Sequence, residues 1–285
     1  DANNGLFSSI VAGGVGSYSI TYTYTDGNTC TNSTDITVDV TPLPVVTMAP
    51  DITICEDNPT IDISSMVNPT GGVWSYNGPG LAGTIFNPSI AGPGTYIFTY
   101  SYGIGSCNVE ENLTINVNGL PSLSIDADEM VCEQVSCLPL SASPSGGFWT
   151  SNNGGVILGN CFDPSASGIG NYTLTYNYID GNGCSNTADL NVEVYSIPQL
   201  VVADTFYCEV NAYYSLPTPN FTGGIWSGPG ITDPNGNFNP VTAGGAGTYI
   251  LNYAYSDALG CSNDIDITVT VTPVPVVDLG ADQAL

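Results

Sequence analysis

The sequence predicts an all-β protein built from tandem β-sandwich repeats. Three observations point to this fold class: a turn-rich composition, alternating apolar residues and a long internal repeat. The 285 residues include 34 glycines and 20 prolines, which separate short segments rich in Thr, Val, Ile and Tyr. Such punctuated β-prone segments are typical of all-β proteins. No segment keeps a helical hydrophobic period, and no apolar run reaches the 18 residues that suggest a membrane-spanning helix.

Alternation predicts the two longest strands of each repeat. Every second residue of 96–102 is aromatic, and every second residue of 113–117 is aliphatic. A period of two with one apolar face predicts antiparallel strands that are buried on one side. In another repeat the turn Asp180–Gly183 follows the equivalent aromatic segment, and its Asp-Gly and Asn-Gly pairs are a strong hairpin signal.

An internal repeat of about 77 residues defines the domain organisation. Three complete repeats are predicted at 44–118, 119–197 and 198–274, whereas 1–43 matches only the C-terminal half of a repeat and 275–285 only the start of a further one. About seven short strands with a central Trp predict an Ig-like sandwich of two sheets. Proline-containing linkers predict that these sandwiches form an extended rod. The repeat is marked by hairpin cysteines (Cys30, Cys107, Cys184, Cys261), start cysteines (Cys55, Cys132, Cys208) and tryptophans (Trp74, Trp149, Trp226).

The absence of basic residues excludes several classes of function. The chain has no Lys, Arg or His, and its 26 Asp and Glu residues give a net charge of −26. There is no imidazole for acid–base work and no cation to neutralise phosphate. We therefore expect neither a nucleic-acid partner nor attraction to an anionic membrane. Glycoside hydrolysis needs only two carboxylates, but the acids lie at repeat-equivalent turns and linkers. The prediction is that the chain is not an enzyme and has no catalytic residues.

The constant spacing of the cysteines predicts disulfides within each repeat. A start cysteine and the hairpin cysteine of the same repeat lie 52 or 53 residues apart. Buried free thiols or a metal site are the alternatives. Systematic pairing indicates an oxidising compartment outside the cytoplasm. The expected bonds are Cys55–Cys107, Cys132–Cys184 and Cys208–Cys261, with an additional Cys137–Cys161 bond and with Cys30 unpaired in this sequence.

Four aspartates near the repeat joints are candidate calcium ligands: Asp126, Asp128, Asp278 and Asp282. Oxygen ligands suit Ca²⁺, and carboxylates at the joints of cadherin-like rods bind calcium and stiffen them. No EF-hand-like loop is present, however, and the joint near Asp51 carries fewer acids. A solvated acidic surface, with no metal and no cofactor, is therefore the main expectation.

The aromatic residues have two interpretations. Their strand face supplies the obvious core, and large aromatic side chains dominate the burial of apolar surface in small domains. The alternative is a platform on which sugars stack. We expect a core.

Several motifs resemble a known repeat type: Gly223-Gly224-Ile225-Trp226, Ala91–Tyr96, Asp180–Asn186 and Val277–Asp282. The pattern is similar to Ig-like or PKD-like repeats of giant surface proteins of Bacteroidota, among them gliding-motility-associated adhesins exported by the type IX secretion system. The resemblance covers nearly the whole chain. It implies a cell-surface location, a stalk or adhesive role, and a sorting domain outside this window.

The resulting hypothesis is a structural stalk or filament-forming repeat region of a large secreted cell-surface protein, an adhesin. The alternative is that the repeats themselves bind glycans or surfaces. The expected partners are further repeats of the same chain and neighbouring copies in a fibre, with no segment inserted into a membrane and the ligand unidentified. The expected location is extracellular, at the cell surface.

Overall fold

The computed structural model describes residues 5–104, 107–278 and 280. The chain forms two compact units, one with the residues up to Pro121 together with Ile179–Ser185, the other with Ser122–Tyr178 and the residues from Asn186 onward. Strands dominate, and the helices are single turns of four residues. The predicted all-β fold of tandem Ig-like sandwiches is confirmed. Among the described residues, no helix is long and apolar enough to cross a membrane.

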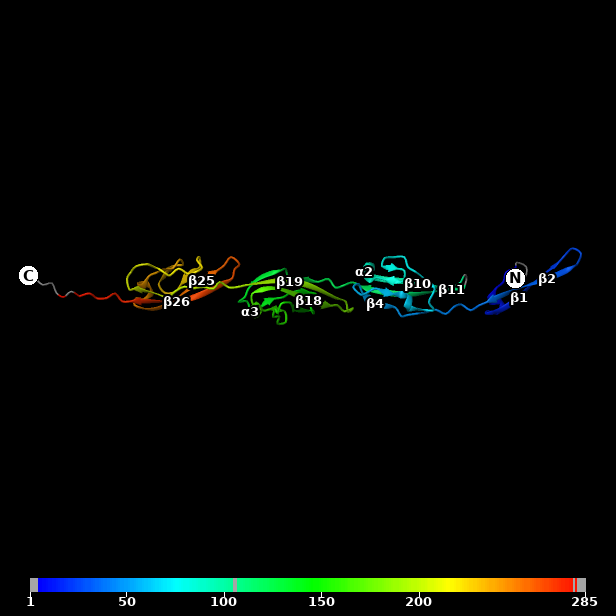
Figure 1. Cartoon of the computed structure of the whole chain (residues 1–285), viewed down its shortest axis with the longest axis horizontal. Helices are drawn as coiled ribbons and strands as arrows, with labels where there is room; N and C mark the ends of the chain where they lie inside the picture. The colour runs from blue at the N-terminus through cyan, green and yellow to red at the C-terminus, as the bar shows by residue number, and fades with distance from the viewer. Residues whose placement is uncertain (1–4, 105–106, 279, 281–285) are drawn as a thin grey trace, which may run out of the picture. The chain divides into compact units, whose positions relative to one another are not determined.

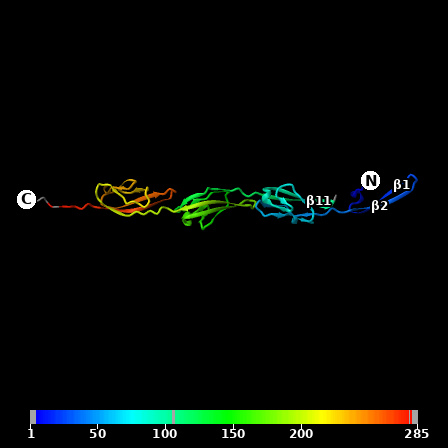
Figure 2. The same ribbon diagram turned by 45° about the horizontal axis from the view of Figure 1, so that its top comes forward.

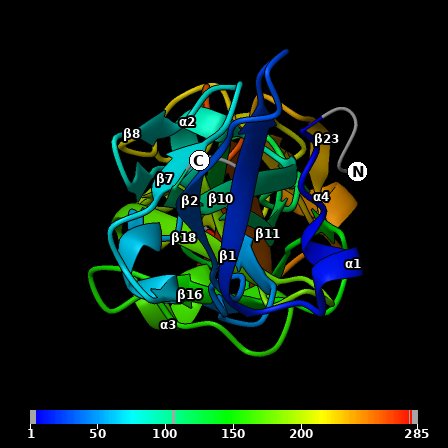
Figure 3. The same ribbon diagram turned by 90° about the vertical axis from the view of Figure 1, so that its right-hand side faces the viewer.

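The N-terminal half-repeat is a hairpin. Its elements are α1 (Ser9–Ala12), β1 (Gly16–Thr25) and β2 (Thr31–Val40). β1 and β2 pair antiparallel along their whole length and form a sheet of two strands. They are the two long blue strands in Figure 2 and, seen from the N-terminal side, in Figure 3.

The first complete repeat contains a sheet of four strands in the order β4-β11-β10-β7. Its other strands form the sheets β5-β9-β8 and β3-β6. The two longest strands, β10 and β11, run antiparallel side by side (Figure 1). The elements are β3 (Thr47–Met48), β4 (Ile52–Cys55), β5 (Ile61–Asp62), η1 (Ile63–Met66), β6 (Val67–Asn68), β7 (Val73–Ser75), β8 (Leu81–Ala82), β9 (Ile85–Phe86), α2 (Pro88–Ala91), β10 (Gly94–Ile104) and β11 (Cys107–Asn118).

The next two repeats have the same four-stranded sheet, in the orders β13-β19-β18-β16 and β20-β26-β25-β22. Short strands again supply the facing layer, as β12-β15 with β14-β17 in the second repeat and as β21-β24-β23 in the third. The second repeat comprises β12 (Ser124–Ile125), β13 (Glu129–Cys132), β14 (Leu138–Pro139), β15 (Ala142–Ser143), β16 (Phe148–Ser151), β17 (Cys161–Phe162), α3 (Pro164–Ser167), β18 (Gly170–Ile179) and β19 (Ser185–Tyr195). The third comprises β20 (Thr205–Cys208), β21 (Tyr214–Ser215), β22 (Ile225–Ser227), β23 (Ile231–Asp233), β24 (Asn237–Phe238), α4 (Pro240–Ala243), β25 (Gly247–Ser256) and β26 (Ser262–Thr272).

The edge strand that carries the start cysteine is parallel to the last strand of its own repeat. β4 pairs with the C-terminal end of β11, so that Cys55 lies opposite Asn118. Cys132 and Cys208 lie opposite Tyr195 and Thr272 in the same way. Each start cysteine is therefore at the end of the sheet where the chain leaves the repeat.

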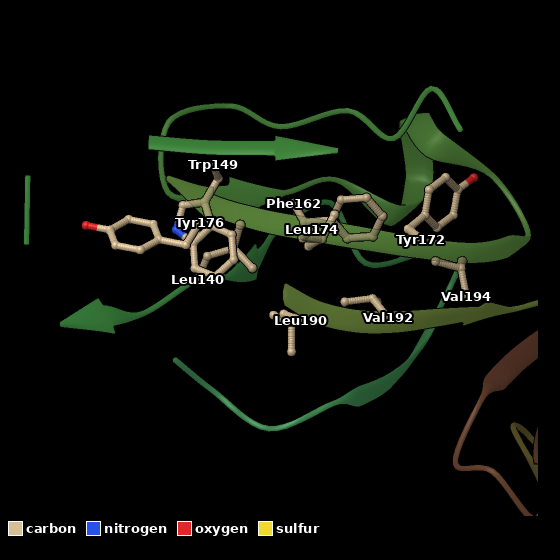
Figure 4. Close-up of a cluster of buried hydrophobic side chains, with 9 residues drawn as sticks. All are labelled: Leu140, Trp149, Phe162, Tyr172, Leu174, Tyr176, Leu190, Val192 and Val194. Atoms are coloured by element: carbon tan, nitrogen blue, oxygen red, sulfur yellow. The ribbon is translucent and has the colours of Figure 1, made fainter. Parts of the chain in front are cut away.

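The alternating aromatic and aliphatic residues form the core, as predicted. In the second repeat, Tyr172, Leu174 and Tyr176 of β18 are buried against Phe162 and against the aliphatic residues of β19. Figure 4 shows these side chains gathered along the two strands. The same pattern recurs in the first and third repeats.

The Gly-Gly-x-Trp motif is explained by one buried tyrosine. The Tyr176 hydroxyl donates to the carbonyl oxygen of Pro144 at 2.7 Å and accepts from the Gly147 N–H at 2.8 Å. Trp149 packs against the Tyr176 ring, with the ring centroids 5.2 Å apart. The second glycine is required because a Cβ at Gly147 would overlap this ring and a neighbouring strand carbonyl. Tyr100 and Tyr253 make the same bonds in their repeats.

The Phe-Asn/Asp-Pro motif builds the short helix before each long hairpin. Phe162 is fully buried, the Asp163 carboxylate accepts from the Ala166 N–H at 3.1 Å, and Pro164 occupies the first helical position. This is the favoured arrangement of a helix N-terminus, because proline lacks only an N–H that would be unpaired there. Asn87 and Asn239 cap α2 and α4 in the same way.

We predict that Gly147→Ala destabilises the second repeat by about 1–3 kcal/mol, because the added methyl group overpacks the Tyr176 site. Gly181→Ala is the matched control, since a Cβ there meets no atom. Amide hydrogen exchange of β18 measures the difference. Equal exchange rates in the two variants would contradict this role of the glycine.

The Asp163 cap is expected to make the second repeat sensitive to acid. Hydrogen bonds from Ser165 and from the Ala166 N–H lower the pKa of Asp163 below its ordinary value. The cap therefore stabilises the fold above the pKa of an unfolded Asp, and this contribution is lost as pH falls through the lowered pKa. Asp163→Asn keeps the cap without a titrating group, as at Asn87 and Asn239.

The free energy of unfolding of the second repeat, compared between wild type and Asp163→Asn, should shift in favour of the variant as pH is lowered from about 7 to 2. Parallel pH profiles for the two proteins would show that the carboxylate does not act through its charge.

Candidate functional site: cysteine bridges between repeats

Two disulfides join a start cysteine to the hairpin cysteine of the following repeat. Cys55 is bonded to Cys184, and Cys132 to Cys261, each with a sequence separation of 129 residues. The Cα atoms lie 5.5 and 5.6 Å apart, within the usual range for a disulfide. Both hairpin cysteines are buried at these bridges. The bridges therefore connect successive repeats covalently.

The predicted pairs Cys55–Cys107, Cys132–Cys184 and Cys208–Cys261 are wrong. Cys55 lies opposite Asn118 at one end of β11, whereas Cys107 begins the same strand at the other end. Twelve residues of strand at ~3.3 Å each separate the two ends by several tens of ångströms. A disulfide between the start cysteine and the hairpin cysteine of the same repeat is therefore geometrically excluded.

An aspartate of the hairpin turn holds three of the four hairpin cysteines, Cys30, Cys184 and Cys261, in position. The Asp180 carboxylate accepts from the N–H groups of Asn182 and Cys184, each at 2.9 Å. Asp257 holds Cys261 in the same way, and Asp26 holds Cys30. The aspartate of the turn motif thus positions the backbone of the cysteine. Its sequence pattern indicated only a turn.

Polar contacts surround the Cys132–Cys261 bridge. The Glu133 carboxylate accepts from the Ile197 N–H at 3.0 Å, and the Gln134 amide donates to the carbonyl oxygen of Ser262 at 3.2 Å. Asn263 donates to the carbonyl oxygen of Pro198 at 2.9 Å. The joint between these two repeats is therefore held by hydrogen bonds as well as by the disulfide.

The remaining cysteines agree in part with the sequence analysis. Cys137 and Cys161 are bonded to each other, as predicted, and join two segments within the second repeat. Cys30 is unpaired, also as predicted, but Cys107 and Cys208 are free as well. Cys30 and Cys208 are exposed and Cys107 is partly exposed.

The candidate calcium ligands do not form a metal site in the described part of the chain. The Asp126 carboxylate accepts from the Ser141 N–H at 2.8 Å, and that of Asp128 from the Asn191 N–H at 2.9 Å. Asp278 is exposed and accepts from the Gly280 N–H, and Asp282 lies outside the described residues. No group of three or more Asp, Glu, Cys or His side chains suited to a metal occurs among the described residues.

Asp128 belongs to a set of aspartates with a structural role. Asp51 and Asp204 occupy the same place and accept from the N–H groups of Thr114 and Thr268, at 2.8 and 2.7 Å. Each bond satisfies a strand N–H just before the parallel pairing begins. These carboxylates therefore support the edge strand that carries the start cysteine.

The tryptophans serve the core in the second and third repeats. Trp149 and Trp226 are buried, and Trp74 is half-buried against Tyr100. These buried rings do not form an exposed platform for sugars. The second repeat has a surface recess of about 570 Å³, whose lining includes the polar residues Asp128, Asn153 and Asn171.

The sequence matches no protein-family model and no curated protein. Among solved structures, the chain is similar to a Ca²⁺-stabilised adhesin with which an Antarctic bacterium binds ice, at 13% identity over 93% of this chain and 83% of that one, with a TM-score of 0.38. It is also similar to the N-terminal eight Ig domains of Down Syndrome Cell Adhesion Molecule (13% identity, 89% and 43% covered, TM-score 0.36). A third is mouse protocadherin-24 EC1-3 (12% identity, 82% and 100% covered, TM-score 0.30). Likeness at this level concerns the fold alone.

The bridges predict an unusual response to a single cut in the backbone. Because the chain has no Lys or Arg, Ser196→Lys creates one tryptic site, in the exposed linker between the second and third repeats. Residue 196 lies between Cys132 and Cys261, so the two fragments should stay joined until reductant is added. Non-reducing electrophoresis and mass spectrometry measure this.

Val276→Lys is the control, because it lies beyond both bridged segments and its cleavage should release residues 277–285 without reductant. Separation of the Ser196→Lys fragments without reductant would contradict the Cys132–Cys261 bond, since disulfides confined to single repeats cannot hold them together.

Proposed function

We propose that this chain is a load-bearing stalk region of a secreted cell-surface protein, in which successive Ig-like domains at 44–118, 119–197 and 198–274 are linked covalently. The observation that carries the proposal is the pair of disulfides that link each start cysteine to the next repeat. A bridge between repeats limits how far they can separate, which is the property that a stalk requires.

The bridges shorten the covalent path through the chain. From Cys55 to Cys261 the backbone contains 206 residues, but the path through both disulfides contains only the 52 residues between Cys132 and Cys184. At ~3.5 Å per extended residue, the fully stretched lengths are about 720 Å and about 180 Å. Complete unfolding of the sheets would therefore release only about a quarter of the backbone's contour while the bridges are intact.

The composition supports an exposed, extracellular role. Disulfides persist in oxidising compartments. The net charge of −26 makes neighbouring copies repel each other at low salt, and the absence of Lys and Arg removes every tryptic cleavage site. The resemblance to repeats of gliding-motility-associated surface adhesins, exported by type IX secretion, fits the same role. On this proposal an adhesive tip, not these repeats, contacts the ligand.

Single-molecule stretching between handles at residues 45 and 276 tests the stalk. The oxidised chain should reach its limiting extension early, and reduction of the disulfides should add about 540 Å, the difference between the two paths. Cys55→Ser/Cys132→Ser is the matched variant and should stretch fully without reductant. If oxidised wild type stretches as far as this variant, the bridges bear no load and the stalk proposal fails.

The polar recess of the second repeat favours a second candidate function, the binding of a glycan. Its volume of about 570 Å³ suits a small ligand, and its Asn and Asp side chains can bond to hydroxyl groups. Asn153→Ala alters this recess without touching the core, since Asn153 is exposed. A glycan that binds the wild type but not Asn153→Ala would move the adhesive role to the repeats. If no glycan binds to the wild type, the stalk remains the one proposed function.

A further inference from the structure

The sheet of the N-terminal hairpin contains only β1 and β2, and among the described residues much of its core face is uncovered. Tyr22 is 66% exposed, whereas its equivalents Tyr100, Tyr176 and Tyr253 are 1–3% exposed. Ile36 is 61% exposed, but the equivalent aliphatic residues of the complete repeats are at most 2% exposed. Within the described part of the chain, this apolar face is therefore buried in the complete repeats and open in the hairpin.

The complete repeats show what covers this face. In the first, β4 lies parallel to β11, β7 pairs with β10, and Trp74 of β7 packs on Tyr100 with a centroid distance of 5.0 Å. β4 and β7 extend the sheet at its two edges, Trp74 covers Tyr100, and both strands come from residues 44–79, the first half of the repeat. An occupant of the β1–β2 face must supply an equivalent edge strand and an equivalent tryptophan.

The free Cys107 points to the same occupant. In the repeat alignment, Thr41 corresponds to Asn118, the residue that lies opposite Cys55. A strand that pairs with β2 as β4 pairs with β11 therefore places its cysteine opposite Thr41. The Thr41 hydroxyl lies 4.0 Å from the Cys107 sulfur. A cavity of about 510 Å³ opens beside them, and its lining includes Pro42 and Pro44. Cys184 and Cys261, the equivalents of Cys107, are buried at their disulfides, whereas Cys107 is partly exposed.

We propose that the β1–β2 face and Cys107 form one docking site for a first-half repeat segment, of the type of residues 44–79. The segment adds its edge strand to the Val38–Thr41 end of the hairpin and places its tryptophan on Tyr22. Its cysteine then bonds to Cys107. The site is independent of the mechanical role proposed above, because it concerns the completion of one sandwich.

The covalent step is a thiol–disulfide exchange. The Cys107 thiolate attacks the sulfur of the segment's cysteine when that cysteine is held as a mixed disulfide with a small thiol. The new disulfide forms as the bond to the small thiol breaks, and the small thiol leaves as a thiolate that takes up the proton from Cys107. The mixed disulfide is the oxidant, because its bond to the small thiol is reduced as the new disulfide forms.

The test uses the 285-residue chain and a peptide of residues 44–79, prepared as the glutathione mixed disulfide at Cys55. The expected product is a one-to-one adduct at Cys107, formed about tenfold more readily than adducts at the exposed Cys30 and Cys208. Amide exchange of β1 and β2 should slow by about tenfold or more in the adduct. Chymotryptic peptide mapping identifies the bonded cysteine.

Two chain variants separate docking from thiol access. Tyr22→Ser should abolish the preference for Cys107, because it removes the aromatic side chain on which the tryptophan packs. Ile97→Ser is the matched control, since Ile97 is exposed on a complete repeat, and it should leave the preference unchanged. Equal adduct formation at all three free cysteines, or an unchanged preference in Tyr22→Ser, would overturn the proposal.

A fusion that places a second copy of residues 44–79 before the hairpin tests the same site without relying on peptide affinity. The fused cysteine should bond to Cys107, and β1 and β2 should become protected from exchange. Unprotected strands in the fusion would also overturn the proposal. So would a stable homodimer of the unfused chain that protects Tyr22 and Ile36, because the occupant would then be a second copy.

Discussion

The parallel pairing of the short cysteine-bearing edge strand with the last long strand of each repeat is the constraint on which the rest of the structure depends. It places the start cysteine at the end of the sheet where the chain leaves the repeat. The hairpin cysteine of that repeat lies at the opposite end. A cysteine at the exit can reach only the next repeat. The disulfides therefore join successive repeats, and each sandwich becomes part of a covalently linked series.

A chain with no basic residues needs such a network more than most. Salt bridges between side chains are unavailable to it, and 26 acidic groups repel one another. Stability then depends on apolar burial, on backbone pairing and on hydrogen bonds from uncharged groups. The carboxylates that the fold does use accept from backbone N–H groups, as at Asp128 and Asp180. These acidic residues thus stabilise the fold by accepting backbone hydrogen bonds. From the sequence, those near the joints were also candidate calcium ligands.

Overlap of the two bridges has a mechanical consequence. The segment 132–184 lies inside both closed loops and is the shortest backbone connection between the two bridges, so it becomes taut first under load. Disulfides confined to single domains would leave every linker as a point at which one backbone break separates the chain. The observed register removes this weakness between Cys55 and Cys261. That difference explains why pairing, more than the number of disulfides, decides the proposed function.

The sequence by itself determined the all-β class, the repeat, the core and the local motifs. Alternation assigned Leu174 and Tyr176 to the interior, and the Phe-Asp-Pro motif indicated an ordered turn, because these features depend on neighbours only a few residues apart. The cysteine pairing was decided by the tertiary structure. Within a periodic chain, every pairing of the two cysteine series has a constant spacing, so spacing cannot distinguish an offset of 52 from one of 129. Only the parallel register of β4 on β11, a contact between residues about 63 positions apart, decides which cysteines can meet.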